Sequence, residues 1–518
     1  MKYYPKLMRL FFKLLSGAAF GIAVLPYIVI PKLPMPEGCN LLSPYFSYSD
    51  VDLLIDRTYR DEAMEENLLD HEILDSIIRE IRTAETFLIV DFFLWNDWQG
   101  RFAKNNGQEL IPLGSKLAEA IIQKRKANPE IPILVITDPI NRLYGDTNPD
   151  FFQPFEDLGI PVVYTDLYEL PDSNKIYSKQ VRFWSKFYDL NPNNNRFRIF
   201  PNLVEAKAER LSLSQFFKAL HLKANHRKVL IAGYKNSPSK MIIGSFNPSD
   251  ASSFNSNLSV SVSGPVADFA ARSEIAIAEW SALKPENLLG KRFALDDAFR
   301  RLDQVVLPQD HFNQYTSRKT GVRFISEGAT NQVILDLLKD ADKGTELDIA
   351  MFYLSDRKII KAIKSAAKKG AKIRLLLDQN KNAFGFKKMG IPNRSVADEL
   401  MQMDEVDSIE IHWATEKTEG QFHTKALRMY DDQKDILFLG SSNFTHRCIN
   451  NYNLEANVLF NDVIAVNNEF DLYFESIWDN TLGFEESFEY KALKNPKWMQ
   501  YVRLIFYRIQ EWTQFSTY

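Results

Sequence analysis

The sequence predicts a duplicated α/β protein, in which two pseudo-symmetric α/β/α sandwiches share one functional site and follow an N-terminal membrane helix. Three observations predict this fold. The 518 residues are too many for one hydrophobic core. Helical and strand-like patterns alternate along the chain, as they do where helices cover a sheet. The same succession of patterns then occurs a second time.

The composition is that of an ordinary folded protein, with 45% hydrophobic and 25% charged residues. A net charge of -4 gives no global electrostatic reason to expect nucleic acid as a partner. Cys39 and Cys448 are the two cysteines of the sequence, which excludes a disulfide framework and a cysteine-based zinc site. Any chemistry is therefore expected from other side chains.

Residues 1–40 are expected to form a membrane anchor or signal region. Four basic residues and no acidic ones precede an uncharged stretch at 14–31, which is about long enough to cross a bilayer. The basic flank should stay cytoplasmic, so the following domains are expected on the periplasmic or extracellular side. A cleaved signal peptide and a buried core helix are the alternatives. Pro26 and its bulky neighbours leave no small-residue cleavage site, which favours an uncleaved anchor.

The two copies are expected at 45–284 and 319–485, with a linker at 285–318 between them. Each copy opens with a helical pattern that leads into an apolar strand, at 73–97 in the first and 333–356 in the second. A second helix and strand follow in each copy, and residues 486–518 form a C-terminal amphipathic helix. Three landmark pairs recur at offsets of 196 to 198 residues, namely His226 with His423, Asn247 with Asn443, and Trp280 with Trp478.

Each copy next contains His-x-Lys, a strand, a short polar turn, a second strand and Gly-Ser-x-Asn. Two strands joined by a short turn form a hairpin, which returns the asparagine to the neighbourhood of the histidine. Alternation along a strand points the histidine and lysine to one face, while Arg227 and Thr424 should face the other way. Each copy is thus expected to supply one imidazole, one ammonium and one carboxamide to a common spot.

Two such sets suit a phosphodiester. Ammonium and amide donors stabilise the charge that grows on the non-bridging oxygens without a metal. One imidazole can attack phosphorus, and the other can protonate the leaving alkoxide and then activate water or an alcohol. Imidazole serves both tasks because its unperturbed pKa is about 6.5.

These paired motifs resemble the phospholipase D superfamily over about residues 50 to 480, and the run at 440–458 resembles its bacterial membrane-anchored phospholipase D and cardiolipin synthase branch. The resemblance implies a phospholipase D-type fold, a covalent phosphohistidine, and no metal or other cofactor. It implies one half-site made of His226, Lys228 and Asn247 and another made of His423, Lys425 and Asn443.

The resemblance further implies that His226 is the nucleophile and His423 the general acid and base. Glu455 matches the acidic residue that orients a histidine, and Asn257 stands at the corresponding place of the first copy. Ser245 and Ser441, in the two Gly-Ser-x-Asn motifs, are expected to support the site.

One departure concerns an aspartate that the superfamily's longer signature has seven residues after each histidine. Gly233 and Tyr430 stand there instead. Asp431 follows Tyr430, so a one-residue shift of the hairpin could restore the carboxylate in the second copy. We interpret the change as one of structural support.

The expected function is that of a phosphodiesterase or phosphatidyltransferase acting on membrane glycerophospholipids, with an anionic lipid surface as partner. Water as acceptor gives a phospholipase, and glycerol or phosphatidylglycerol gives a cardiolipin synthase-type transferase; the sequence determines neither the acceptor nor the oligomeric state. A nuclease and an inactive lipid-binding scaffold are the alternatives. The net negative charge and the expected membrane anchor argue against nucleic acid as the substrate.

Four further features have two interpretations or a secondary role. The triplet at 221–223 also reads His-x-Lys and is expected in the strand or loop before the hairpin. Trp95 and Trp98 line a substrate entrance or pack in a core. Cys448 approaches the site or is a small buried hydrophobe. The apolar stripe of 497–512 is expected to face a core, with an interfacial membrane helix as the alternative.

Overall fold

The computed structural model describes residues 24–514, except residues 30, 388, 416 and 419 and the segments 100–108, 145–150, 175–176, 189–197, 203–209, 284–291, 384–385, 404–405 and 494–495. Most of the expected N-terminal anchor lies outside the described residues. None of the described helices is both long enough and apolar enough to span a bilayer.

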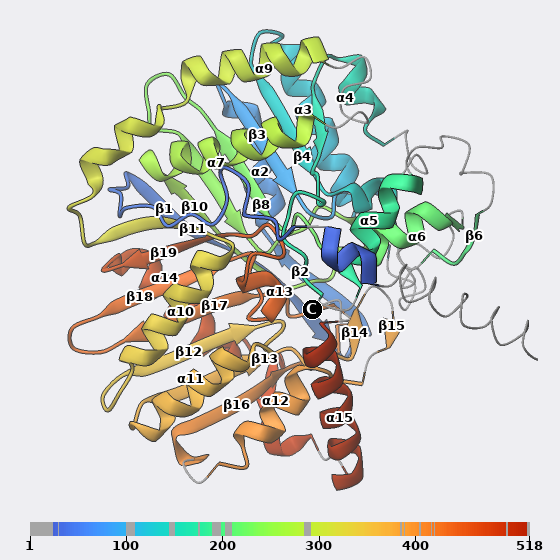
Figure 1. Ribbon diagram of the computed structural model, residues 1–518. Helices are drawn as coiled ribbons and strands as arrows, with labels where there is room; N and C mark the ends of the chain where they lie inside the picture. Colours follow the sequence, from blue (N-terminus) through green and yellow to red (C-terminus); the bar gives the residue numbers. More distant parts are fainter. Residues whose placement is uncertain are drawn as a thin grey trace, which may run out of the picture.

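Two large sheets dominate the described part of the chain (Figure 1). The first contains β1 (Asp50–Asp61), β2 (Glu66–His71), β3 (Leu88–Phe92), β4 (Ile133–Thr137), β5 (Val162–Tyr164), β8 (Lys228–Ala232), β9 (Lys240–Gly244) and β10 (Asn257–Ser263). The second contains β11 (Gly321–Ser326), β12 (Glu346–Met351), β13 (Lys372–Leu377), β16 (Ile409–Ala414), β17 (Lys425–Tyr430), β18 (Asp435–Gly440), β19 (Ala456–Asn461) and β20 (Ser487–Glu489).

The two sheets repeat one strand order. Without its outer strand β2, the first reads β1-β10-β9-β8-β3-β4-β5, and without β20 the second reads β11-β19-β18-β17-β12-β13-β16. In each sheet the last three strands of this order are parallel and the others pair antiparallel. The predicted α/β duplication is therefore confirmed as two mixed sheets with matching topology.

Helices cover both sheets. The outer face of the first packs against α2 (Ile73–Thr83), α3 (Leu113–Ala127) and α4 (Gln153–Asp157), and that of the second against α10 (Gly328–Asp340), α11 (Arg357–Lys368), α12 (Asn393–Leu400) and α15 (Lys497–Thr513). The central core between the sheets draws residues from both copies and includes α7 (Pro265–Ala282) and α14 (Ile464–Trp478). The two copies thus share one hydrophobic core, which fixes their relative position.

Shorter elements connect these layers. They are η1 (Pro139–Arg142), α5 (Ser178–Tyr188), β6 (Arg198–Phe200), β7 (Leu211–Ser212), α6 (Leu213–Ala219), η3 (Asp250–Ser252), α9 (Arg292–Val305), η4 (Gln309–Tyr315), β14 (Asn382–Ala383), β15 (Phe386–Lys387), η5 (Val406–Ser408), α13 (His446–Ile449) and η6 (Tyr490–Ala492). The segment expected as a linker contains α9 and η4, which bury Leu302 and Phe312 in the central core.

Candidate active site

The predicted hairpins place both His-x-Lys motifs beside both Gly-Ser-x-Asn motifs. β8 begins at Lys228 and pairs antiparallel with β9, which ends at Gly244, and β17 and β18 repeat this arrangement from Lys425 to Gly440. The hairpin therefore brings the end of its second strand back to the start of its first, where the histidine and lysine lie.

The two copies meet at these strand ends. The backbone N–H of His226 donates to the Leu454 carbonyl at 2.9 Å, and the N–H of His423 donates to the Ser256 carbonyl at 2.8 Å. Leu454 precedes Glu455 and Ser256 precedes Asn257. Each motif histidine is thus attached to the segment of the other copy that contains Glu455 or Asn257.

The two histidines have different partners. Nδ1 of His226 lies 2.9 Å from Oε2 of Glu455. Nδ1 of His423 lies 2.9 Å from the Ser245 carbonyl oxygen and 3.2 Å from Oδ1 of Asn257. Because carbonyl oxygens only accept, Nδ1 of His423 carries the proton and its Nε2 is the basic nitrogen of the neutral ring. The side chain of an acidic residue therefore supports one imidazole, and a backbone carbonyl and an amide support the other.

The two lysines occupy equivalent positions. Nζ of Lys228 donates to the His226 carbonyl at 2.7 Å, and Nζ of Lys425 donates to the His423 carbonyl at 2.6 Å. Each ammonium lies over an aromatic ring, with 5.2 Å from Lys228 to the Phe93 centroid and 4.9 Å from Lys425 to that of Phe352. Burial lowers the pKa of Lys228 to about 8 and that of Lys425 well below its ordinary value.

Burial also sets the protonation of the imidazoles. It lowers the pKa of His226 and of His423 well below 6.5, and the charges of Lys228 and Lys425 lower both further. Both rings are therefore neutral at pH 7 in the empty site. A neutral imidazole has the lone pair that nucleophilic attack requires.

The two motif asparagines offer unused polar atoms. Oδ1 of Asn247 and Oδ1 of Asn443 are buried without a hydrogen-bond partner among the described residues. Buried polar side-chain atoms are rarely left unpaired in folded proteins. A matching unpaired amide oxygen in each copy, two residues after the motif serine, indicates a position for a polar ligand.

Ser245 and Ser441 support the orienting residues. The Ser441 hydroxyl donates to Oε2 of Glu455, and the Ser245 hydroxyl donates to Oδ1 of Asn257 at 3.3 Å. Burial raises the pKa of Glu455 to about 8, against the opposing effect of the nearby lysines. The serines thus hold these two side chains against the imidazoles.

Cys448 does approach the site. One ligand atom each from Cys448, His226 and Glu455 lies within 4.8 Å of the others, which among the described residues is the one group able to hold a metal ion. Burial raises the pKa of the Cys448 thiol, and two lysine ammonium groups lie close to Glu455. These charges favour an anion over a cation here.

Three acidic residues of the surroundings were not assigned to the site from the sequence. Asp138 accepts from the backbone N–H of Asn225 at 2.7 Å, and Asp378 accepts from that of Phe422 at 2.9 Å. Each donor residue immediately precedes a motif histidine, so the two aspartates at strand ends hold the His-x-Lys loops. Asp138 and Asp378 follow equivalent strands of the two copies, β4 and β13, and this match in the sequence could have identified them. Asp56 lies behind Asn257 and accepts from its amide at 3.4 Å.

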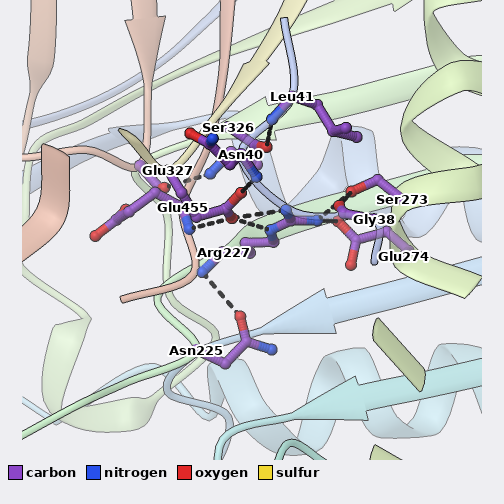
Figure 2. A network of polar contacts seen from close by, with 12 residues as sticks. Gly38, Asn40, Leu41, Asn225, Arg227, Ser273, Glu274, Ser326, Glu327 and Glu455 are labelled. Carbon is purple, nitrogen blue, oxygen red and sulfur yellow. Dashed lines mark hydrogen bonds and ion pairs between the residues drawn. The ribbon is translucent and has the colours of Figure 1, made fainter. Parts of the chain in front are cut away.

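Arg227 faces away from the site, as predicted, into a buried network (Figure 2). Its guanidinium donates to Glu327 at 3.2 and 2.7 Å and to Glu274 at 3.0 Å. The same oxygen of Glu327 accepts from the backbone N–H of Glu455 at 3.0 Å, and its other oxygen accepts from that of Asn40 at 2.6 Å. Glu327 of the second copy therefore links Arg227, which follows His226, to Glu455, whose side chain contacts the His226 ring.

The second out-of-phase residue also behaves as predicted. The Thr424 hydroxyl lies 2.9 Å from the Tyr473 hydroxyl on α14, in the central core. The triplet at 221–223 lies in the loop after α6, where Lys223 donates to the Leu170 carbonyl at 2.6 Å. Trp95 is fully buried and packs edge-on against Phe152, so its role is in the core.

The predicted shift that would return Asp431 to the site is wrong. Asp431 lies in the hairpin turn, where its carboxylate accepts from the backbone N–H groups of Gln433 and Lys434. Gly233 packs so closely on the Phe87 ring that a Cβ atom would lie 2.3 Å from it. Asp431 thus closes the hairpin turn, and the absence of a side chain at Gly233 allows the close packing on Phe87.

The preferred core-facing orientation of the C-terminal stripe is also wrong. α15 does pack on the second copy, but through Arg503 and Tyr507, which are buried. The stripe itself points to solvent, with Trp512 80% exposed.

Comparisons with known proteins agree with these motifs. Residues 334–478 match the family described as "Cardiolipin synthase, PLD-like domain". No curated protein matches the chain.

Solved structures give distant resemblances. Phosphatidylserine synthase of Haemophilus influenzae Rd KW20 is 13% identical, with a TM-score of 0.49 over 91% of this chain and 97% of that one. Nuc of Salmonella typhimurium, a phospholipase D family member, is 16% identical, with a TM-score of 0.26 over 33% and 99%. Polyphosphate kinase of Porphyromonas gingivalis is 11% identical, with a TM-score of 0.42 over 85% and 51%.

Proposed function

We propose that this chain, which carries a phospholipase D-like domain of the phospholipase D superfamily at residues 334–478, cleaves or exchanges the headgroup phosphodiester of membrane glycerophospholipids. The observation that supports this proposal most directly is the meeting of two His-Lys-Asn sets at one buried spot. Each histidine there is oriented by a residue of the other copy.

The first step forms a covalent phosphohistidine. Nδ1 of His226 is engaged by Glu455, so Nε2 attacks phosphorus and the bond from phosphorus to the headgroup oxygen breaks. The negative charge of the bound phosphodiester favours protonation of His423 at Nε2, and the resulting imidazolium gives this proton to that oxygen as the alcohol leaves. Its lowered pKa makes it a stronger acid for this transfer. Lys228 and Lys425 stabilise the charge on the non-bridging oxygens.

The second step regenerates the enzyme. Neutral His423 removes a proton from water or an alcohol, whose oxygen attacks phosphorus and displaces His226. Water yields phosphatidic acid, and glycerol or phosphatidylglycerol yields an exchanged lipid of the cardiolipin synthase type. The step requires no metal, because lysines and amides supply the positive charge and donors.

The proposed location is a membrane, with the catalytic copies on its non-cytoplasmic side. The uncharged stretch at 14–31 after four basic residues supports this topology. The basic segment would then meet the anionic headgroups of the cytoplasmic leaflet, and the catalytic copies would meet the substrate in the opposite leaflet.

The test is incubation of the full-length protein with phosphatidylglycerol and phosphatidylethanolamine, with and without glycerol, followed by lipid mass spectrometry. We expect phosphatidic acid or exchanged headgroups, and a loss of at least about a thousandfold in turnover for His226→Ala and for His423→Ala. His311→Ala, at a histidine of η4 outside the site, is the matched control. Substantial turnover in both site variants would refute the shared site, and cleavage of DNA without lipid turnover would favour a nuclease.

A further inference from the structure

α15 has one face packed on the protein and one face in water. Its inner face is held by the Tyr507 hydroxyl, which donates to the Ser355 carbonyl at 2.8 Å, and by Arg503, 3.3 Å from Asp398. Its outer face exposes six large apolar side chains, Trp498 (65%), Tyr501 (67%), Ile505 (59%), Phe506 (50%), Ile509 (51%) and Trp512 (80%).

Such a stripe is costly in water. Exposed apolar area costs about 25 cal/mol per Å², and contiguous apolar patches on soluble surfaces mark interaction sites. The spacings follow the helical repeat, so the six side chains form one strip along the helix. A tryptophan stands near each end, and tryptophan rings favour the boundary between apolar and polar media.

The helix is attached to the loops of the active site. The Ser355 carbonyl that binds Tyr507 belongs to a residue whose N–H donates to the Phe444 carbonyl at 2.9 Å, and Phe444 follows Asn443. At the other end, Arg447 of α13 donates to the Gln514 carbonyl, at the C-terminal cap of α15, at 2.8 Å. The orientation of the stripe relative to the site is therefore fixed by these bonds.

The N-terminal segment emerges beside the same end of α15. Arg182 donates to the Pro31 carbonyl at 3.0 Å and to Asp172 at 2.7 Å, and the neighbouring Ser173 accepts from Arg447 at 3.5 Å. Figure 1 draws the short N-terminal helix, in blue, on the same side as the end of α15. That helix, residues 24–29, exposes further apolar side chains, Leu25 (42%), Ile28 (76%) and Val29 (56%).

We propose that α15 lies in the interface of a phospholipid membrane, with its apolar stripe inserted among the acyl chains, and thereby orients the active site toward the lipid headgroups. The inference rests on the proposed lipid substrate and adds the surface by which the enzyme meets it. A membrane fits this face because the chain that leads into residues 24–29 has four cations, no acidic residue and an uncharged run. The cations attract the anionic headgroups of the cytoplasmic leaflet and the apolar run partitions into the bilayer, so the end of this run brings α15 to the membrane surface; a second copy would bring like charges together.

The test uses the full-length protein and vesicles of phosphatidylcholine and phosphatidylglycerol with brominated acyl chains, which quench tryptophans that reach them. Trp498 and Trp512 serve as reporters. The variant Ile505→Asp/Ile509→Asp keeps both reporters and places charge in the stripe. We expect quenching by the vesicles to fall at least about fivefold, and turnover of vesicle lipid at least about tenfold, because a charged helix face leaves the apolar phase.

Turnover of a short-chain phosphodiester dissolved as monomers should stay within about twofold of the unmodified protein. The matched control is Ile464→Asp/Leu472→Asp on α14, where the two side chains are 66% and 73% exposed on another element. That variant should retain both quenching and vesicle turnover.

Equal quenching in the stripe variant and the unmodified protein, or none in either, would overturn the inference. Dimerisation that the stripe variant abolishes, without quenching, would overturn it in favour of a second copy. A protein that turns over no phosphodiester would refute the proposed function alone, because quenching is read without turnover.

Discussion

Replacement of Glu327 by glutamine should weaken the junction between the two copies more than any surface charge change. Both oxygens of Glu327 are used in the buried network of Arg227, which donates to one of them at 3.2 and 2.7 Å. That oxygen also accepts from the Glu455 N–H at 3.0 Å, and the other accepts from the Asn40 N–H at 2.6 Å. An amide has one oxygen, so its NH₂ group must face a donor.

The magnitude follows from the burial. The side chains of Arg227 and Glu327 are 0% exposed, and removal of one partner from such a pair typically costs about 3–5 kcal/mol. The loss should lie toward the lower end of this range, because Arg227 keeps its ion pair with Glu274 at 3.0 Å. Glu327 also has φ +45°, a region that costs about 1–3 kcal/mol for a residue with a side chain. The four hydrogen bonds offset this strain in the native protein, and the variant keeps the strain while it loses bonds.

The assay is chemical denaturation of the full-length protein, with the free energy of unfolding taken from the transition that abolishes activity. We expect Glu327→Gln to lower it by about 3–5 kcal/mol. The control Glu62→Gln removes an exposed ion pair with Lys417 at 2.9 Å and should change the free energy of unfolding by less than about 1 kcal/mol. A Glu327→Gln protein within about 1 kcal/mol of the unmodified one would refute the reasoning that the network joins the copies.

Three further predictions concern the site and its support. Glu455→Gln should lower turnover about 10- to 100-fold, because the amide cannot stabilise the positive charge that develops on His226 as it attacks phosphorus, and a hydrogen bond to a charged group contributes about 1.5–3 kcal/mol; an unchanged kcat would contradict its orienting role. Burial raises the pKa of Asp56 to about 7, so its protonated form stabilises the fold below pH 4 and this contribution is lost as pH rises through 7. The melting temperature of the unmodified protein, relative to Asp56→Asn, should therefore fall between pH 4.5 and 7.5, and a rise would contradict the burial argument. Gly233→Asp, which restores the signature aspartate, should cost about 1–3 kcal/mol by overpacking and give no gain in turnover; increased kcat would show that the aspartate acts in catalysis.

The prediction of the hairpins from sequence succeeded because its signals are local. A strand, a polar turn and a second strand determine which end of the hairpin carries His423 and Asn443, and alternation determines that Thr424 points away. The repeat of the same pattern predicted that two such ends exist. Both conclusions need only residues close together in the chain.

The pairing of His226 with Glu455 depends on residues 229 positions apart, and only the shared core between the sheets decided it. The same holds for the ion pair of Arg227 and Glu327, since the two residues belong to different copies. Charge partners of this kind have no periodic signature, so a single sequence does not identify them.

The sequence by itself determined the duplication, the sheet-and-helix order, and the residue types that each copy contributes, because periodicity and turn chemistry act between near neighbours. Only the tertiary structure decided which orienting residue serves which histidine and which face of α15 is covered. A helical stripe records that one side is apolar but not whether protein lies against it, and here Arg503 and Tyr507 are inside while Trp498 and Trp512 are outside. Packing between distant segments decides that question, since Tyr507 and Arg503 bind Ser355 and Asp398, which are more than 100 positions away in the chain.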